Sequence, residues 1–160
     1  MRRAFRLQLA FMAILALSLG VTGPVMAGDD VTFRGRLDGT ATVTPLTPPF
    51  ASVLIVGTGN ATQLGRFTVE VPHIVNQATR IAEGSYLFTA ANGDTLTADF
   101  TGQATLVAPG VLSIVETAII TGGTGRFAGA TGTFSAARMF YPATGATTGS
   151  FEGTISTPGK

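Results

Sequence analysis

The sequence contains no cysteine, no tryptophan and only one histidine among its 160 residues. Without cysteine the chain has no disulfide, no thiolate nucleophile and no cysteine-ligated metal site. The one histidine, His73, cannot build a zinc site alone, and a serine–histidine–aspartate triad would need two partners brought to it by the fold. We therefore expect no metal and no cofactor, and we place His73 at the surface or at a strand end.

Charge is scarce as well, because Asp, Glu, Lys and Arg make up 12% of the chain. After residue 27, seven basic residues stand against nine acidic ones, which leaves a net charge of −2 in that part of the chain. Nucleic-acid binding needs a basic surface, and the sequence offers none. We therefore expect no nucleic-acid partner.

The first 27 residues have the order of a secretory signal peptide. Arg2, Arg3 and Arg6 precede an apolar run over residues 7–19, and Val25 and Ala27 supply the small residues of a cleavage site. The run is shorter than the ~20 residues that a membrane-spanning helix needs. We predict cleavage after Ala27, export to the periplasm or the extracellular space, a mature domain of residues 28–160, and no membrane contact after cleavage.

Glycine, threonine and phenylalanine are abundant in the mature part, with 21 glycines and 11 phenylalanines in the whole chain. After Gly28 the apolar residues follow a period of two, which is typical of half-buried strands, and none of the segments has a helical period. About eight such segments follow one another at short spacing, with a turn expected over residues 57–62 and a strand break or bulge at Pro72. The pattern suits a meander sandwich or a barrel, and we predict an all-β fold, a single antiparallel up-and-down barrel.

Asn92-Gly93 marks a hairpin between the segments 84–89 and 95–106. A two-residue turn would mix buried and exposed faces, so we expect a longer loop or a bulge. That loop would place Tyr86 opposite Phe100, with both side chains inside the barrel.

Residues 122–132 read Gly-Gly-Thr-Gly-Arg-Phe-Ala-Gly-Ala-Thr-Gly. This segment resembles the glycine-rich loop of the allene oxide cyclase and dirigent barrel superfamily and of its uncharacterised exported bacterial relatives. The resemblance implies that the loop joins two barrel strands and that Phe127 plugs one barrel end. We expect Gly122, Gly123 and Gly125 to adopt positive φ, and Gly129 belongs to the same structural loop.

Characterised members of that superfamily enclose an apolar cavity and either cyclise a lipid-derived epoxide or direct radical coupling. Their catalytic residues do not align with particular positions of this chain, so the resemblance assigns no catalytic residue here.

Glu116 and Arg138 each interrupt an apolar strand face on opposite sides of the glycine-rich loop. If Thr121 pairs with Thr133, the two charges lie directly opposite each other. Inside the barrel they would be expensive to desolvate, as is tolerated at functional sites. Outside it they would form an ordinary surface salt bridge.

Three hypotheses for function follow. The protein is a non-catalytic barrel that binds a small apolar ligand or a partner, a cyclase- or isomerase-like enzyme, or a structural exported protein with a filled core. If there is a cavity, we expect Tyr86, Phe100, Glu116 and Arg138 to contact the ligand. A second copy of the chain is a further candidate partner.

Overall fold

The structure is a computed structural model that describes residues 28–158. It consists of eight strands and one short 3-10 turn. The elements are β1 (Val31–Pro45), β2 (Phe50–Ala61), β3 (Gly65–Asn76), β4 (Ile81–Ala90), β5 (Thr95–Ala108), β6 (Val111–Gly123), η1 (Gly125–Phe127), β7 (Thr131–Tyr141) and β8 (Ala146–Ser156).

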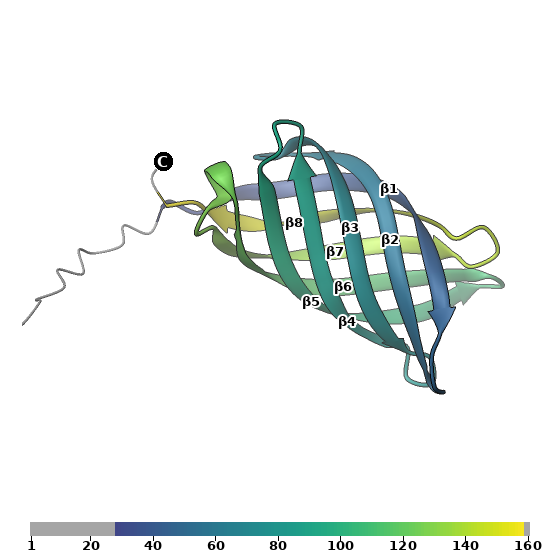
Figure 1. Ribbon diagram of the computed structural model, residues 1–160. Helices are drawn as coiled ribbons and strands as arrows, with labels where there is room; N and C mark the ends of the chain where they lie inside the picture. The colour runs from purple at the N-terminus through teal and green to yellow at the C-terminus, as the bar shows by residue number, and fades with distance from the viewer. Residues whose placement is uncertain (1–27, 159–160) are drawn as a thin grey trace, which may run out of the picture.

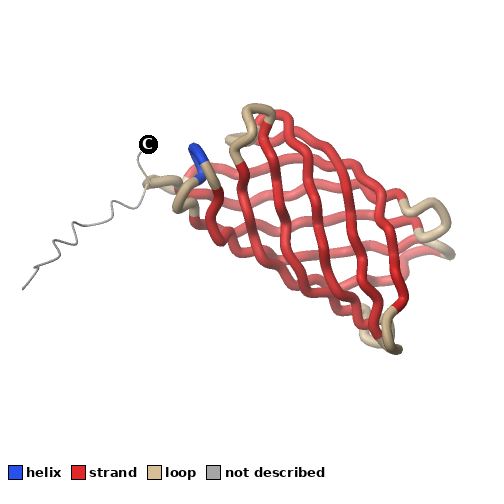
Figure 2. The backbone as a smooth tube through the Cα atoms, viewed as in Figure 1, coloured by secondary structure: helices blue, strands red, loops and turns tan. Residues whose placement is uncertain are grey.

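Each strand pairs antiparallel with its neighbours in the sequence, and β8 returns to β1 to close the barrel. Figures 1 and 2 show the strands running obliquely around the barrel, with η1 at one end. We call this the η1 end, and we call the opposite end, which holds the β1–β2, β3–β4, β5–β6 and β7–β8 connections, the open end. The predicted all-β up-and-down barrel of eight strands is confirmed. Among residues 28–158, no helix has the length and apolarity needed to cross a bilayer.

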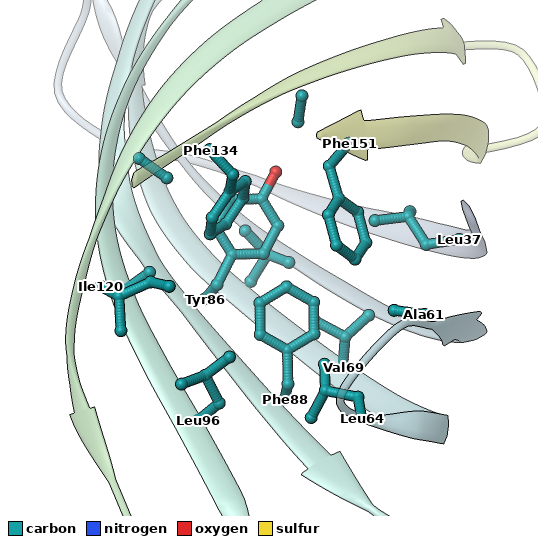
Figure 3. Packing of buried hydrophobic residues seen from close by; sticks show 14 of the residues in the cluster. Leu37, Ala61, Leu64, Val69, Tyr86, Phe88, Leu96, Ile120, Phe134 and Phe151 are labelled. Carbon is teal, nitrogen blue, oxygen red and sulfur yellow. The ribbon is translucent and has the colours of Figure 1, made fainter. Parts of the chain in front are cut away.

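Aromatic rings fill the middle of the barrel (Figure 3). Tyr86 stacks on Phe88 at a centroid distance of 5.3 Å, and Phe134 packs edge-on against Tyr86 at 5.4 Å. Gly35 makes room for this cluster, because a Cβ there would lie 2.7 Å from the ring of Phe151. Glycines on the inward face of the strands therefore leave space for the rings.

The β4–β5 hairpin has the longer loop that we expected, but the predicted pairing of Tyr86 with Phe100 is wrong. Tyr86 pairs with Ala98, and Gly84 pairs with Phe100. Gly93 has φ +88° and closes a three-residue loop, in which the Ala90 N–H donates to the Asp94 carbonyl at 2.9 Å. A three-residue loop places its positive-φ glycine last, so the loop starts one residue earlier than predicted and the pairing moves by two residues. A shift of two keeps both side chains facing inward.

Strands β2 and β3 run further than the sequence suggested. The expected turn over residues 57–62 is wrong, because β2 continues to Ala61 and pairs with β3 along its whole length. Pro72 stays within β3, although the pairing of β3 with β4 is interrupted at residues 71 and 72 and resumes in the same register at His73. Proline lacks the N–H that a ladder with β4 would use, so the interruption is confined to that side.

The glycine-rich loop closes the η1 end. Phe127 is 1% exposed and belongs to the central hydrophobic cluster, so its predicted burial at a barrel end is confirmed. The Arg126 guanidinium lies 4.9 Å from the centre of the Phe127 ring and donates to the Leu64 carbonyl at 3.0 Å. These contacts fasten η1 to the β2–β3 connection.

Positive φ angles occur in this loop at Gly122, Gly125 and Gly129. The expectation for Gly123 is wrong, because its φ is not positive. Gly123 is needed for a different reason: a Cβ there would collide with the Thr95 carbonyl and lie 2.8 Å from the Cβ of Phe127.

Candidate functional site

The open end leads into a cavity of about 440 Å³ inside the barrel. Its walls come from β1, β2, β3, β5, β6 and β7 and are mostly alanine, valine, isoleucine and leucine side chains. Small inward residues such as Ala41 and Ala104 leave this space, whereas phenylalanines fill the equivalent positions nearer η1. The polar lining residues are His73, Gln77, Arg80 and Arg138.

Arg138 and Glu116 form a buried ion pair where the cavity meets the packed core. Their side chains are 2% and 1% exposed. The Arg138 Nε donates to Glu116 Oε2 at 3.0 Å, and its Nη2 donates to Glu116 Oε1. A two-pronged bond of this kind fixes both groups in orientation as well as in position.

The predicted direct opposition of Glu116 and Arg138 is wrong, although their contact is confirmed. Glu116 pairs with Ala136 and Arg138 pairs with Ile114, so the two charges meet on a diagonal. Thr121 is an unpaired bulge between the pairs that β5 forms with Ile120 and Gly122, and β6–β7 pairing ends at Ile120. The last β6–β7 pair joins Ile120 and Gly132, one residue earlier in each strand than the predicted Thr121–Thr133 pair, so each partner moves by two residues.

Two hydroxyl groups complete the polar cluster. The Tyr86 hydroxyl donates to Glu116 Oε2, and Arg138 Nη1 donates to Thr147 Oγ1 at 3.0 Å. Thr147 Oγ1 in turn donates to the Met139 carbonyl at 3.0 Å. All buried side-chain nitrogen and oxygen atoms in residues 28–158 have a hydrogen-bond partner.

The surroundings of the cluster raise the pKa values of two of its members, Tyr86 and Arg138. Burial, reinforced by the Glu116 carboxylate, raises the pKa of Tyr86 well above its ordinary value. Burial alone would lower the pKa of Arg138, but the hydrogen bond and charge of Glu116 outweigh it, and the pKa of Arg138 is raised. Tyr86 therefore stays a donor and Arg138 stays a cation at neutral pH.

Arg138 has N–H groups beyond those that it uses in the polar cluster. A guanidinium carries five N–H donors, and three of them are used within the described chain, two by Glu116 and one by Thr147. Arg138 also lines the cavity.

His73 is the second polar group of the cavity floor. Its Nδ1 lies 2.9 Å from the Val71 carbonyl, which can only accept, so Nδ1 carries the proton and Nε2 keeps a lone pair. Burial lowers the pKa of His73, against the opposing effect of that hydrogen bond. The ring packs against Phe100 at 5.7 Å, and Gly84, which pairs with both residues, leaves space between them.

The cavity contains Arg138 but not the other three residues that we expected to contact a ligand. Tyr86 and Glu116 lie behind Arg138 and hold it in place, and Phe100 packs in the core behind His73. The expected place of His73 at the surface or a strand end is wrong. Its alternation with Phe67, Val69 and Val71 was the signal that it faces inward.

Other candidate sites are weaker. In the part of the chain that the structure describes, no three His, Cys, Asp or Glu side chains gather closely enough to hold a metal ion. A hollow of about 670 Å³ lies on the outer wall over β7, β8 and β1. Arg34, Arg36 and Glu152 border it, and its lining shares no residue with the cavity.

No protein-family model matches the chain, and no curated protein matches its sequence. Among solved structures, the chain is similar to the pterocarpan synthase dirigent protein GePTS1, with a TM-score of 0.57 and 14% sequence identity. The match covers 84% of this chain and 89% of that protein. At this identity the likeness concerns architecture alone, and it agrees with the resemblance of the glycine-rich loop. The chain thus has the barrel fold of the dirigent proteins.

Proposed function

We propose that the protein binds a small, largely apolar ligand in the open-end cavity, with a polar group of the ligand held by Arg138 and His73. The observation that carries this proposal is the combination of apolar walls with unused hydrogen-bonding capacity at the floor. A volume of about 440 Å³ falls in the range of small-molecule sites, roughly 300–1,000 Å³. The cavity also argues against a barrel whose core is completely filled.

The chemistry of the floor favours an uncharged ligand. Arg138 is neutralised by Glu116, and the lowered pKa of His73 keeps its ring neutral at neutral pH. A charged ligand would bring a buried charge without a partner, which is costly. A hydroxyl group, alone or beside a carbonyl, can accept from an Arg138 N–H and donate to His73 Nε2.

An uncharged fluorescent probe, N-phenylnaphthylamine, tests the cavity directly. We expect its fluorescence to rise with the wild-type protein, and Ala104→Phe to weaken the affinity by about tenfold or more, because the new ring occupies the cavity. Thr105→Phe is the matched control, since the neighbouring side chain is exposed and does not line the cavity. Unchanged binding in Ala104→Phe, or equal losses in both variants, would contradict the proposal.

Catalysis is a second candidate function, favoured by the His73 lone pair beside a guanidinium that can stabilise a developing oxyanion. The pterocarpan synthase named above shows this fold in a protein described as a synthase. A proton-transfer isomerase or cyclase would use His73 as its base. In deuterated water, catalysis should exchange the acidic C–H hydrogens of a bound ligand. Loss of this exchange in His73→Gln, while the variant still binds the ligand, would support catalysis over binding alone.

Export is part of the proposal, and it rests on the predicted signal peptide. Residues 1–27 lie outside the residues that the structure describes, so cleavage after Ala27 stays a prediction. N-terminal sequencing of protein released by an exporting bacterial host should begin at Gly28. Released protein that still contained residues 7–19 would rule out the predicted cleavage.

A further inference from the structure

Six exposed apolar side chains surround the mouth of the cavity. They come from the connections of the open end and from the strand ends that adjoin all four of them, and they are 38% to 54% exposed. We call them the apolar rim: Leu46, Phe50, Ile81, Leu106, Val107 and Tyr141. Neighbouring residues of the same connections, such as Val43 and Pro142, line the cavity, so the rim and the mouth form one surface.

This surface is almost free of charge. Residues 43–52, 75–82, 103–115 and 139–148 form the connections and the adjoining strand ends, and Arg80 is the one charged side chain in them. Arg80 is exposed and lines the mouth of the cavity. An apolar ring with one cation and no carboxylate is complementary to an apolar phase bordered by negative charge.

Many backbone N–H groups of these connections already have acceptors within the protein, which lowers the free-energy cost of removing them from water. In the β3–β4 connection, the N–H groups of residues 77–81 all donate to acceptors within the protein, two of them to the side chain of Asn76. Pro48, Pro49, Pro109 and Pro142 have no N–H to satisfy. Unsatisfied backbone groups are the main obstacle to burying a loop in an apolar phase, and the N–H groups of the β3–β4 connection present no such obstacle.

We propose that the open end docks on the surface of a phospholipid bilayer, with the apolar rim entering the interface and Arg80 meeting an anionic headgroup. The cavity then opens onto the apolar phase in which an uncharged apolar ligand dissolves. The argument from ligand access rests on the proposed ligand binding. The arguments from charge and from backbone hydrogen bonds do not depend on ligand binding. The docking departs from our expectation of no membrane contact after cleavage, which was based on the signal peptide alone.

Vesicle co-sedimentation of the processed protein tests the proposal. We expect binding to phosphatidylcholine vesicles that contain phosphatidylglycerol, and weaker binding to phosphatidylcholine alone. Val107→Asp should weaken the binding by about tenfold, because it removes an inserted apolar side chain and adds a charge. Val56→Asp is a matched control, since both valines are 54% exposed but Val56 lies on the barrel wall, in the middle of β2.

Arg80→Gln should weaken the affinity for the anionic vesicles by about fivefold and leave the affinity for phosphatidylcholine vesicles unchanged. Phe50→Ser provides a second rim variant, so that the test does not depend on one substitution. Thermal unfolding should show that each variant folds.

The outcomes separate docking from ligand binding. Val107 does not line the cavity, so Val107→Asp should bind N-phenylnaphthylamine in solution as the wild type does. Absence of vesicle binding, or equal losses in Val107→Asp and Val56→Asp, would overturn the docking even if the probe still binds. A dimer in sedimentation velocity that Val107→Asp dissociates would also overturn it, because the rim would then cover a second copy of the chain.

Discussion

Arg138 reaches Glu116 along a diagonal of the β6–β7 pair, from a strand position nearer the open end. The position directly opposite Glu116 is Ala136, whose small side chain leaves the path clear. A long arginine side chain can span such a diagonal, whereas a shorter one could not. The diagonal also explains why Arg138 lines the cavity while Glu116 is buried behind it.

Removing either partner of this pair should be strongly destabilising. Glu116→Gln or Arg138→Met alone should lower the free energy of unfolding by ~3–5 kcal/mol, because the remaining group is left buried without its partner. The double variant Glu116→Gln with Arg138→Met should lose much less than the sum of the single changes. Chemical denaturation of all four proteins measures the coupling.

Glu83→Gln serves as the control for this cycle, because Glu83 is an exposed acid on the same barrel and its replacement should change stability by less than ~0.5 kcal/mol. A coupling energy near zero between Glu116 and Arg138 would show that the pair contributes nothing, despite its geometry.

Strand faces could be predicted from the sequence, but strand register could not. Period-two alternation correctly placed Tyr86 inside the barrel, but it left open whether Glu116 and Arg138 face inward, as the structure shows they do. Both predicted pairings of these residues were wrong by two positions, because register depends on where a loop begins, and both loops begin one residue earlier than predicted. An error of two residues preserves the face, and this is why the Glu116–Arg138 contact survived it.

The cavity itself could not be predicted. The residues that form its floor are inward-facing residues at the same level along the barrel axis. Strand register decides which residues share a level. His73 of β3 and Arg138 of β7 come from well-separated strands, and no local pattern connects them.

Phe127 should be essential to the η1 end. Phe127→Ala should lower the free energy of unfolding by ~3–5 kcal/mol, since the ring is 1% exposed and its removal leaves a cavity. Phe50→Ala also removes a phenyl ring, but from a side chain that is 43% exposed, so it should lower the free energy of unfolding clearly less. Equal effects in urea titrations of the two variants would mean that the glycine-rich loop does not plug the barrel.

Tyr86 should resist ionisation for as long as the barrel is folded. Its raised pKa means that the folded protein holds a proton that the unfolded chain releases above pH ~10, so stability is full below that pH and falls as pH rises beyond it. In a Tyr141→Phe background, where Tyr86 is the one remaining tyrosine, tyrosinate absorbance should appear together with loss of the β-sheet circular dichroism signal. Tyrosinate formed in the folded protein would place the hydroxyl in contact with solvent.

His73 should titrate below the ordinary histidine pKa of ~6.5, because it is partly buried and its nearest cation, Arg138, opposes its protonation, while Glu116 acts in the other direction. As the chain has one histidine, its imidazole signals in an NMR titration can be assigned without ambiguity. Below pH ~6.5 the unfolded chain binds a proton that the folded protein does not. The free energy of unfolding should therefore be complete above that pH and fall as the pH is lowered toward the folded-state pKa.

Acidification should weaken ligand binding too, once it reaches the folded-state pKa of His73. Protonation removes the Nε2 lone pair that we assign to the ligand's hydroxyl and puts an unneutralised charge into the apolar cavity. His73→Gln should abolish both pH dependences, because the chain then contains no histidine. If the ring titrates at or above its ordinary value, or if Nδ1 rather than Nε2 proves to be the unprotonated nitrogen, the role of His73 as acceptor at the cavity floor is wrong.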